Sequence, residues 1–366
     1  MLISTPSRKE RIMSKRFEKG PQLGDYFVLR RKSKKASFLD QIEAIVDWRP
    51  IEKLLKTKLK RKANAIGNPA YPVLPMFKAL LLQRWFNLSD PGLEEALYDR
   101  ISFVRFTGFS IEDSVPDETT ICRFRNGLIK LKLMDKLLDI INGQLEELKL
   151  LVREGAIVDA SVVESQRRPR KVVDVMSEDR AEDELPDEAG KSEQNDTVSI
   201  SYSDDKDAAW LKKGKRGYYG YKVHVATDSR DGFFLGGHAT PANKSDTGEF
   251  QELMGAVDLA EGAYVFADKA YSSFVNRTFL AKNKLNDGTM DRKPRGGSLT
   301  EYEKLRNKAI SMARYIVERS LGTFKSCYSF ARARYLGIEK VEAELKLIGM
   351  AFNLKKAVRL LAKEIG

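Results

Sequence analysis

Two aspartates of this chain occupy the same local setting in the sequence. Asp159 directly follows the apolar run at residues 156–158, and Asp268 directly follows the apolar run at residues 263–267. Each run is typical of a short buried strand, so each aspartate stands where a strand is expected to leave its sheet. Ligand sites in α/β proteins gather at the carboxyl ends of strands, so we expect the two carboxylates to converge. Either aspartate alone could instead cap a turn or a helix.

A third carboxylate, Glu318, lies in a segment with helical spacing, predicted as one long helix over residues 301–326. At about 100° per residue, four polar residues fall on one stripe about 60° wide. They are Ser311, Arg314, Glu318 and Lys325. An apolar stripe lies beside it, so the helix is expected to pack on a sheet and present one carboxylate between two cations. The simpler alternative is an exposed ion pair between Arg314 and Glu318 at i,i+4.

Three converging carboxylates suit a metal-dependent reaction, because their hard oxygens prefer Mg²⁺ or Mn²⁺. Two such ions about 3.5–4 Å apart activate water or a DNA 3′-hydroxyl and stabilise the leaving oxygen of an in-line displacement at phosphorus. This chemistry needs no histidine base. His224 and His238 both lie in predicted strands, where we expect them to pack with a satisfied hydrogen bond. Asp228 and Asp246 are rival carboxylates, and Asp228 is assigned to the hairpin turn that follows at residues 229–232.

In these residues the chain resembles bacterial insertion-sequence transposases with a DDE catalytic set, and within them insertion sequence family five. Those proteins share a C-terminal signature of Tyr, two residues, Arg, three residues, Glu, six residues and Lys. Arg314, Glu318 and Lys325 match those spacings, and Ser311 stands where the family has tyrosine. The resemblance covers about residues 38–360 and includes Trp210, the segments 220–224, 226–228 and 267–271, and the helical block at 71–127.

The resemblance implies an α/β RNase H-like catalytic domain, with a mixed sheet flanked by helices, preceded by an all-α N-terminal domain. It places Asp159 on the first strand, Asp268 after the fourth, and Glu318 on a following helix. All three are implied to be catalytic and to bind two Mg²⁺ ions per active site, with Mn²⁺ as a substitute. The implied activity is cleavage at insertion-sequence ends and strand transfer into target DNA. Two alternatives stay open: a non-catalytic, sequence-specific DNA-binding protein such as a domesticated transposase, and a structure-selective nuclease of the same fold.

The chain divides into regions of different texture and charge. Residues 1–36 form a basic arm, residues 37–151 have helical spacing and are expected to bind DNA ends, and residues 152–366 are expected to form the catalytic domain. A segment at about 171–207 is acidic and poor in aromatic residues, and we expect a disordered insertion there. Between Asp174 and Asp207, thirteen acidic and three basic residues give a net −10, against +12 for the whole chain. The remaining +22 favours a polyanionic partner such as nucleic acid.

The expected partner is double-stranded DNA, as terminal inverted repeats and as target DNA, bound by a protein that forms a homodimer on it. The sequence contains no run of about 18 apolar residues and no secretory signal, so we expect a cytoplasmic, nucleoid-associated protein. Cys122 and Cys327 have neither disulfide nor zinc-site spacing, and we expect both to be reduced, buried thiols.

Basic and hydroxyl side chains near these motifs are the candidates for DNA contacts. Arg314 and Lys325 are expected on the phosphates of the scissile strand. Thr119 and Thr120 stand near a predicted helix start, where side chains reach phosphates or a groove. The other candidates are Lys222, Arg332, Arg334, Arg123 and Arg125. For these candidates a solvated or structural position is the alternative.

Overall fold

The computed structural model of the chain describes residues 37–59, 70–112, 114–176, 197–203, 205–294 and 296–365. The predicted basic arm at residues 1–36 lies outside these ranges. Within them, no helix combines the length and the apolar character that crossing a membrane requires.

The N-terminal part of the described chain is helical, as predicted. Its elements are α3 (Phe38–Ile45), α4 (Arg49–Lys58), α5 (Val73–Trp85), α6 (Asp90–Asp99), α7 (Ile101–Thr107), α8 (Glu118–Lys130) and α9 (Leu133–Glu147). Polar side chains fix several helix starts by accepting free backbone N–H groups: Ser89 accepts from Gly92 at the start of α6, and Asp117 accepts from Thr120 at the start of α8. Serine and aspartate are among the residue types preferred at helix starts, so the local sequence accounts for both caps.

The second part of the chain is built on a mixed sheet. Its strands are β1 (Gly155–Glu164), β4 (Ala209–Lys213), β5 (Arg216–Asp228), β6 (Phe234–Pro241), β7 (Tyr264–Ala267) and β8 (Asn286–Thr289). β1 is central, antiparallel to β5 and parallel to β7, which is parallel to β8. β5 also pairs with β4 and β6 in antiparallel fashion. This is the mixed sheet flanked by helices that the resemblance implied.

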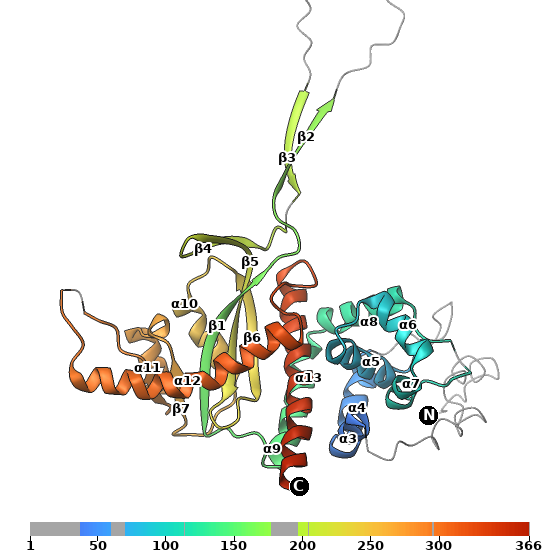
Figure 1. The fold of residues 1–366 in the computed structure, drawn as a ribbon, viewed down its shortest axis with the longest axis horizontal. Helices are drawn as coiled ribbons and strands as arrows, with labels where there is room; N and C mark the ends of the chain where they lie inside the picture. Colours follow the sequence, from blue (N-terminus) through green and yellow to red (C-terminus); the bar gives the residue numbers. More distant parts are fainter. Residues whose placement is uncertain are drawn as a thin grey trace, which may run out of the picture.

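Helices cover both faces of this sheet. They are α10 (Asp246–Gly255), the 3-10 turn η1 (Lys269–Tyr271), α11 (Phe274–Lys282), α12 (Glu301–Cys327) and α13 (Ile338–Ile365). Successive side chains of β5 point to opposite faces of the sheet. On one face, Lys222 pairs with Asp246 of α10. On the other face, Val225 lies opposite Asp159, whose side chain contacts α12. Figure 1 shows α12 running along the sheet and α13 standing between the sheet and the N-terminal helices.

α13 joins the two parts of the molecule into one hydrophobic core, which contains residues of α3, α5, α9, β6 and α13. A buried ion pair, Arg84 with Glu344 at 2.7 Å, connects α5 to α13, and the Trp85 indole donates to the Ala351 carbonyl at 2.8 Å. The predicted boundary at residue 151 therefore lies between the all-helical segment and the segment that contains the sheet. The hydrophobic core, however, extends across this boundary.

The acidic insertion is more ordered at its ends than predicted. β2 (Arg170–Met176) and β3 (Thr197–Ser203) form an antiparallel pair that extends away from the sheet in Figure 1. Close to its C-terminal end, Asp205 is buried and accepts hydrogen bonds from Ser165 and Tyr221. The prediction of disorder was wrong at these ends, because strand pairing and a buried carboxylate hold them. Residues 177–196, the middle of the insertion, lie outside the described residues.

Candidate active site

The two predicted aspartates lie next to each other because of the register between β1 and β7. The parallel pairing ends at Val158 and Ala267, so Asp159 and Asp268 are the next residue on each strand. Their predicted convergence is confirmed. One detail of the prediction was wrong: the chain does not leave the sheet at Asp159, because β1 continues to Glu164 by pairing with β5.

Asp268 also caps the turn that follows it. One of its carboxylate oxygens accepts the Lys269 backbone N–H at 2.6 Å, as expected of an aspartate after a strand. The side chain remains 33% exposed. A single hydrogen bond leaves most of the acceptor capacity of a carboxylate unused, so capping and ligand binding are compatible here.

The third carboxylate comes from α12, which confirms the predicted long helix. Thr300 and Glu303 form a capping box at its start. Val317, Leu321 and Phe324 are buried. Burying side chains of this size contributes roughly 1.5–3 kcal/mol each, which is enough to fix the rotation of the helix. The neighbouring polar stripe then faces the edge where β1 and β7 stop pairing.

Arg314 lies among all three predicted catalytic carboxylates. Its Nη2 atom is 3.3 Å from Asp159 Oδ1 and 3.6 Å from Glu318 Oε1, and its Nη1 atom is 3.8 Å from Asp268 Oδ1. The guanidinium side chain is only 13% exposed. The simple surface pair between Arg314 and Glu318 is therefore one part of a four-residue cluster. One positive and three negative charges leave a formal surplus of two negative charges.

The least exposed carboxylate of the cluster, Asp159, has a raised pKa. Burial raises the pKa of Asp159, and the negative charges of Glu318 and Asp268 act in the same direction. The Arg314 charge and the Ala160 backbone N–H oppose this shift without reversing it. Crowded carboxylates that one guanidinium cannot neutralise fit a divalent cation, because hard oxygen ligands and excess negative charge are what such an ion requires.

Lys325 lies at the rim of this cluster. Partial desolvation and the nearby charge of Lys213 lower its pKa, while Asp159 acts in the opposite direction. Lys213 belongs to the tight hairpin between β4 and β5, which turns at Gly214 with φ +62°. Our sequence analysis did not select Lys213. The basic run at residues 212–216 beside a glycine turn was the signal that could have indicated it.

Tyr271 is a further residue that the sequence analysis left without a role. Its hydroxyl is buried without a hydrogen-bond partner among the described residues. Burial raises the pKa of Tyr271, and the charges of Asp246 and Asp159 add to this effect. The motif at 267–271 had drawn attention to the segment but not to this hydroxyl.

Three of the residues considered above have structural roles instead of open positions. Lys222 is buried, with Nζ 2.8 Å from Asp246, so its predicted DNA contact is not available. Arg125 is also buried and forms two hydrogen bonds of 2.7 Å with Asp90. Asp228 accepts the backbone N–H groups of the turn at residues 231–233, which confirms its assignment to a hairpin turn.

The remaining DNA-contact candidates lie apart from the carboxylates. Thr119, Arg123 and Arg334 line one cavity of about 500 Å³. Arg334 also donates to the Leu88 carbonyl, which makes it partly structural. Arg332 is exposed, and Thr120 donates its backbone N–H to the N-cap residue of α8.

The histidines lie on the opposite face of the sheet from Asp159. Their rings stack with centroids 5.0 Å apart, and burial lowers the pKa of His224 to about 3. His238 lies 3.2 Å from Glu249. His238, Glu249 and Glu252 offer possible metal-ligand atoms within 4.8 Å of one another. The three predicted catalytic carboxylates are instead spaced around Arg314.

Both cysteines carry free thiols, as predicted. Burial was predicted wrongly for Cys327, which is exposed near the end of α12, and Cys122 is only partly buried.

Two family models match the chain. Residues 27–127 match the Transposase domain (DUF772), and residues 151–354 match the Transposase DDE domain. A relative, the transposase for insertion sequence element IS1106 of Neisseria meningitidis serogroup B, is 36% identical over 243 residues. This alignment covers 66% of the present chain and 78% of the relative.

Two solved structures show weaker likeness. A piggyBac transposase synaptic complex with hairpin DNA aligns with 91% of this chain and 80% of its own, at 12% identity and a TM-score of 0.38. A Mos1 transposase paired-end complex with the left transposon end aligns with 85% of this chain and 92% of its own, at 9% identity and a TM-score of 0.21. Both scores are too low to carry an argument about the fold.

The Transposase DDE domain covers more than half of the chain, from before β1 to within α13. Members of this family depend on a divalent metal. The chain thus belongs to the DDE transposases of insertion sequences, and it is a DNA transposase that cleaves DNA and transfers strands.

Proposed function

We propose that Asp159, Asp268 and Glu318 are the metal ligands and the catalytic residues of this transposase. The observation that supports the proposal is the convergence of the three carboxylates, from β1, the end of β7 and α12, around the single guanidinium of Arg314. When bound, two Mg²⁺ ions would supply charge to activate the nucleophile and stabilise the leaving oxygen. Mn²⁺ is the natural substitute for them.

The protein's own contribution is to hold these ligands rigidly. Asp159 lies inside a paired strand, and Asp268 is fixed by the turn that it caps. Arg314 supplies positive charge to the half-buried Asp159 and to its two more exposed neighbours in the metal-free protein. We propose that Arg314 and Lys325 contact the phosphates of the scissile strand, Arg314 with its planar guanidinium and Lys325 as a point charge at the rim.

The substrate in this proposal is the terminal inverted repeat of an insertion sequence, followed by target DNA. The region at residues 37–151 binds the ends, with Thr119 and Arg123 as its candidates for contact, and Arg334 from the catalytic part lines the same cavity. The protein acts as a homodimer assembled on DNA, in the nucleoid, and belongs to insertion sequence family five. The match of residues 27–127 to a transposase domain supports the assignment of this region.

The decisive experiment removes one ligand charge at a time while preserving size. Asp159→Asn, Asp268→Asn and Glu318→Gln should each lower the rate of cleavage of a labelled transposon-end duplex by about 10³-fold or more. Loss of one metal ligand is expected to remove several kcal/mol of transition-state stabilisation, and about 1.4 kcal/mol corresponds to tenfold in rate. Gel-shift affinity for the same duplex should persist. Ca²⁺ should support binding better than cleavage.

Asp258→Asn is the matched control, because this aspartate is exposed and lies outside the cluster. Cleavage at the control rate by any of the three triad variants would remove that residue from the active site. Wild-type cleavage of duplexes without inverted repeats, at the same rate, would favour a structure-selective nuclease. End binding without metal-dependent cleavage by the wild type would favour a DNA-binding protein without catalytic activity.

A further inference from the structure

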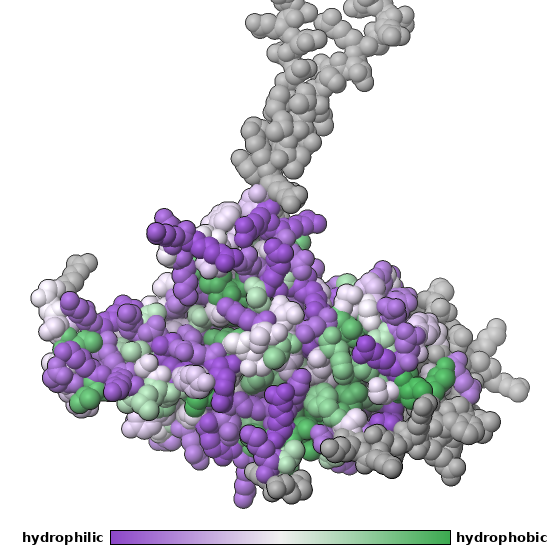
Figure 2. All heavy atoms as spheres, in the orientation of Figure 1, coloured by the Kyte–Doolittle hydropathy of each residue, from purple (hydrophilic) through white to green (hydrophobic). Residues whose placement is uncertain are grey.

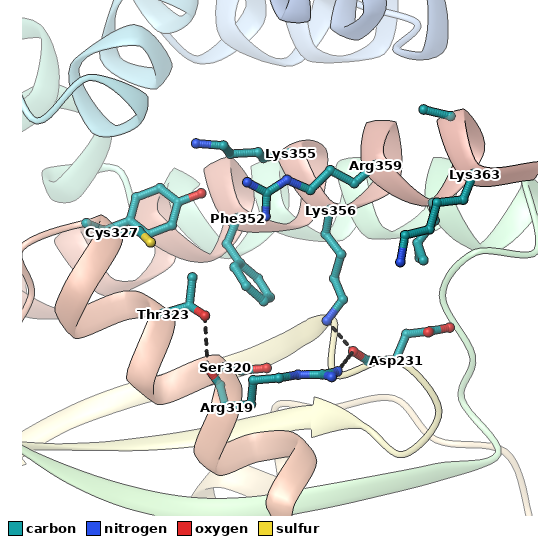
Figure 3. A pocket seen from close by; sticks show the side chains of 13 residues that line it. Asp231, Arg319, Ser320, Thr323, Cys327, Phe352, Lys355, Lys356, Arg359 and Lys363 are labelled. Carbon is teal, nitrogen blue, oxygen red and sulfur yellow. Dashed lines mark hydrogen bonds between the residues drawn. The ribbon is translucent and has the colours of Figure 1, made fainter. Parts of the chain in front are cut away.

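A cationic groove runs between α12 and α13, and the site described above does not use it. The cavity has a volume of about 640 Å³. Figure 3 shows Arg319 of α12 on one side and Lys355, Lys356, Arg359 and Lys363 of α13 on the other. The only carboxylate on the lining is Asp231, and its side chain pairs with Arg230. The groove therefore has a large excess of positive charge.

The cations of this groove have no carboxylate partner among the described residues. Arg319 and Lys356 donate to the Asp231 backbone carbonyl instead of to a carboxylate. Lys356 also lies 4.9 Å from the Phe352 ring centroid. Burial and the charge of Arg319 lower its pKa to about 8. Elsewhere among the described residues, the fully buried cations do have acidic partners, as Lys346 has Asp135 and Glu342. The charge in the groove is consequently left for an external anion to neutralise.

A buried hydrogen-bond donor on the same lining also lacks a partner. The Tyr328 hydroxyl forms no hydrogen bond within the described structure, although the side chain is only 4% exposed. A buried hydroxyl without a partner is costly, at about 1–3 kcal/mol, unless a ligand or water satisfies it. An anionic oxygen entering the groove would satisfy this donor and the surrounding cations together.

The spacing of the cations suits an extended anion more than a single ion. Lys355, Arg359 and Lys363 recur every fourth residue and so lie along one stripe of α13. At about 1.5 Å per residue the stripe spans about 12 Å. Along the axis of a DNA duplex each strand carries one phosphate per about 3.4 Å, so this length matches three or four phosphates of one strand. α12 carries both Glu318 of the active site and Arg319 of the groove, so the two sites share one helix.

We propose that the α12–α13 groove binds the phosphate backbone of the transposon-end duplex whose scissile strand lies at the three carboxylates. This inference rests on the proposed function. The contacts are to phosphates and carry no base recognition, so the groove contributes affinity and register but not the sequence preference. The duplex would approach the groove across α12, with Arg319 as the contact nearest to Glu318 in the sequence.

The test is the salt dependence of DNA affinity in a triple variant of the full chain, Lys355→Gln, Arg359→Gln and Lys363→Gln. Each lost phosphate contact should reduce the steepness of the log-log plot of affinity against salt by about 0.9, so the triple variant should lose about 2.7. At about 0.1 M salt its affinity should fall by roughly 10²–10³-fold, because a slope loss of about 2.7 acts over the decade of salt below 1 M. The loss should be the same for an end duplex and an unrelated duplex.

The matched control removes the same charge elsewhere. Lys244, Lys282 and Lys340 are exposed, lie outside the proposed end-binding region and form no ion pair in the described structure, so their triple change to Gln should leave the slope almost unchanged. If the wild type shows a steep slope and both triple variants match it, the groove assignment is wrong. If the wild type itself shows no salt dependence, it is the proposed DNA binding that fails. A loss confined to the end duplex would contradict phosphate contact.

Two further measurements keep the test decisive. Should the triple variant melt at a lower temperature than wild type, the pair Arg359→Gln and Lys363→Gln, both at exposed positions, should still reduce the slope by about 1.8. Sedimentation without DNA tests a protein occupant: loss of self-association with unchanged DNA affinity would overturn the proposal. In a Cys122→Ser background, Cys327 lines the groove and accepts a thiol-directed crosslinker, which should capture duplex DNA. A crosslinker at Glu261→Cys in a Cys122→Ser, Cys327→Ser background should not.

Discussion

Two arginine-carboxylate clusters of this protein are built from the same groups but differ in charge balance. At the junction of α5, α6, α8 and α13, Arg84 and Arg125 pair with Glu344 and Asp90, each at 2.7 Å. In the active site, Arg314 alone faces three carboxylates at 3.3–3.8 Å. The junction cluster satisfies its own charges, whereas the active-site cluster retains excess negative charge. The comparison indicates that the short ion pairs of the junction stabilise the fold. The longer distances and excess negative charge around Arg314 leave these carboxylates able to bind a cation, as we propose.

The pKa values of one carboxylate in each cluster shift in opposite directions. Burial raises the pKa of Asp159, and the charge of Arg314, which also faces Asp268 and Glu318, opposes this shift without reversing it. Burial also opposes ionisation of Asp90, but the hydrogen bonds and charge of Arg125, with help from Gln83 and Arg84, lower the pKa of Asp90 overall. The ionised carboxylate is thus favourable at the junction and unfavourable in the active site. Each of the following predictions tests this contrast.

The largest effect is expected at the junction, from Arg84→Met. Arg84 is 1% exposed and Glu344 is 3% exposed, so removing the guanidinium leaves a buried carboxylate without its partner. We expect the free energy of unfolding to fall by about 3–5 kcal/mol, measured by urea denaturation at pH 7. Changing Glu344→Leu in the same chain should restore a large part of this loss, since two apolar groups then replace the pair.

Arg49→Met is the matched surface control, because Arg49 pairs with Asp47 at 2.8 Å with its side chain 88% exposed. Its effect should be much smaller than that of Arg84→Met, because solvent screens an exposed ion pair. Equal losses in the two arginine variants would mean that burial does not distinguish the junction cluster from a surface pair.

The second effect in size is expected from Asp90→Asn. The carboxylate accepts two hydrogen bonds from Arg125 and one from Gln83, so its neutral replacement should cost about 1–3 kcal/mol at pH 7. Because the folded-state pKa of Asp90 is lowered from 3.8, its contribution is present above that value. The contribution is lost as pH falls through the lower, folded-state pKa.

The measurement is the difference in unfolding free energy between wild type and Asp90→Asn from pH 7 to pH 3. A difference that grows on acidification would contradict the sign of this linkage. Asp258→Asn, at an exposed position outside both clusters, should give a small difference that is flat over the same range.

The two clusters also show how far the sequence could predict this molecule. Helix caps such as Ser89 and Asp117, and the long helix at 301–326, follow from local chemistry, and the structure confirms them. The convergence of Asp159 and Asp268 was predictable, because each directly follows a short apolar run of the kind found in buried strands. The position of Arg314 among three carboxylates was not, since it depends on the register of β1 with β7 and on the rotation of α12.

Charge alone misled the assignment of DNA contacts. Arg125 and Lys222 were selected because they are basic and lie near motifs, but each is buried against an aspartate distant in the sequence. Conversely, the cations of α13 were not selected, although they recur every fourth residue. Whether a basic side chain is already paired depends on contacts between distant segments, so it requires the tertiary structure. The hairpin at the ends of the acidic insertion was also missed, because polar, acidic composition masks strand pairing at its two ends.

The smallest effect is expected in the active site itself, from Asp159→Asn in the absence of divalent cations. At the junction, removal of a carboxylate charge costs stability; here it relieves repulsion among Asp159, Asp268 and Glu318 while leaving Arg314 two partners. We expect the free energy of unfolding of this variant at pH 7 to equal that of wild type or to exceed it by up to about 1 kcal/mol. Added Mn²⁺ should then reverse the order, because an ion that binds the folded state stabilises wild type, whereas the variant lacks one ligand. Urea denaturation with EDTA and with Mn²⁺ measures both values.

Asp258→Asn should behave as wild type in both conditions. A loss of several kcal/mol in the metal-free Asp159→Asn protein would show that this carboxylate stabilises the fold as Asp90 does, and the contrast between the two clusters would then be wrong.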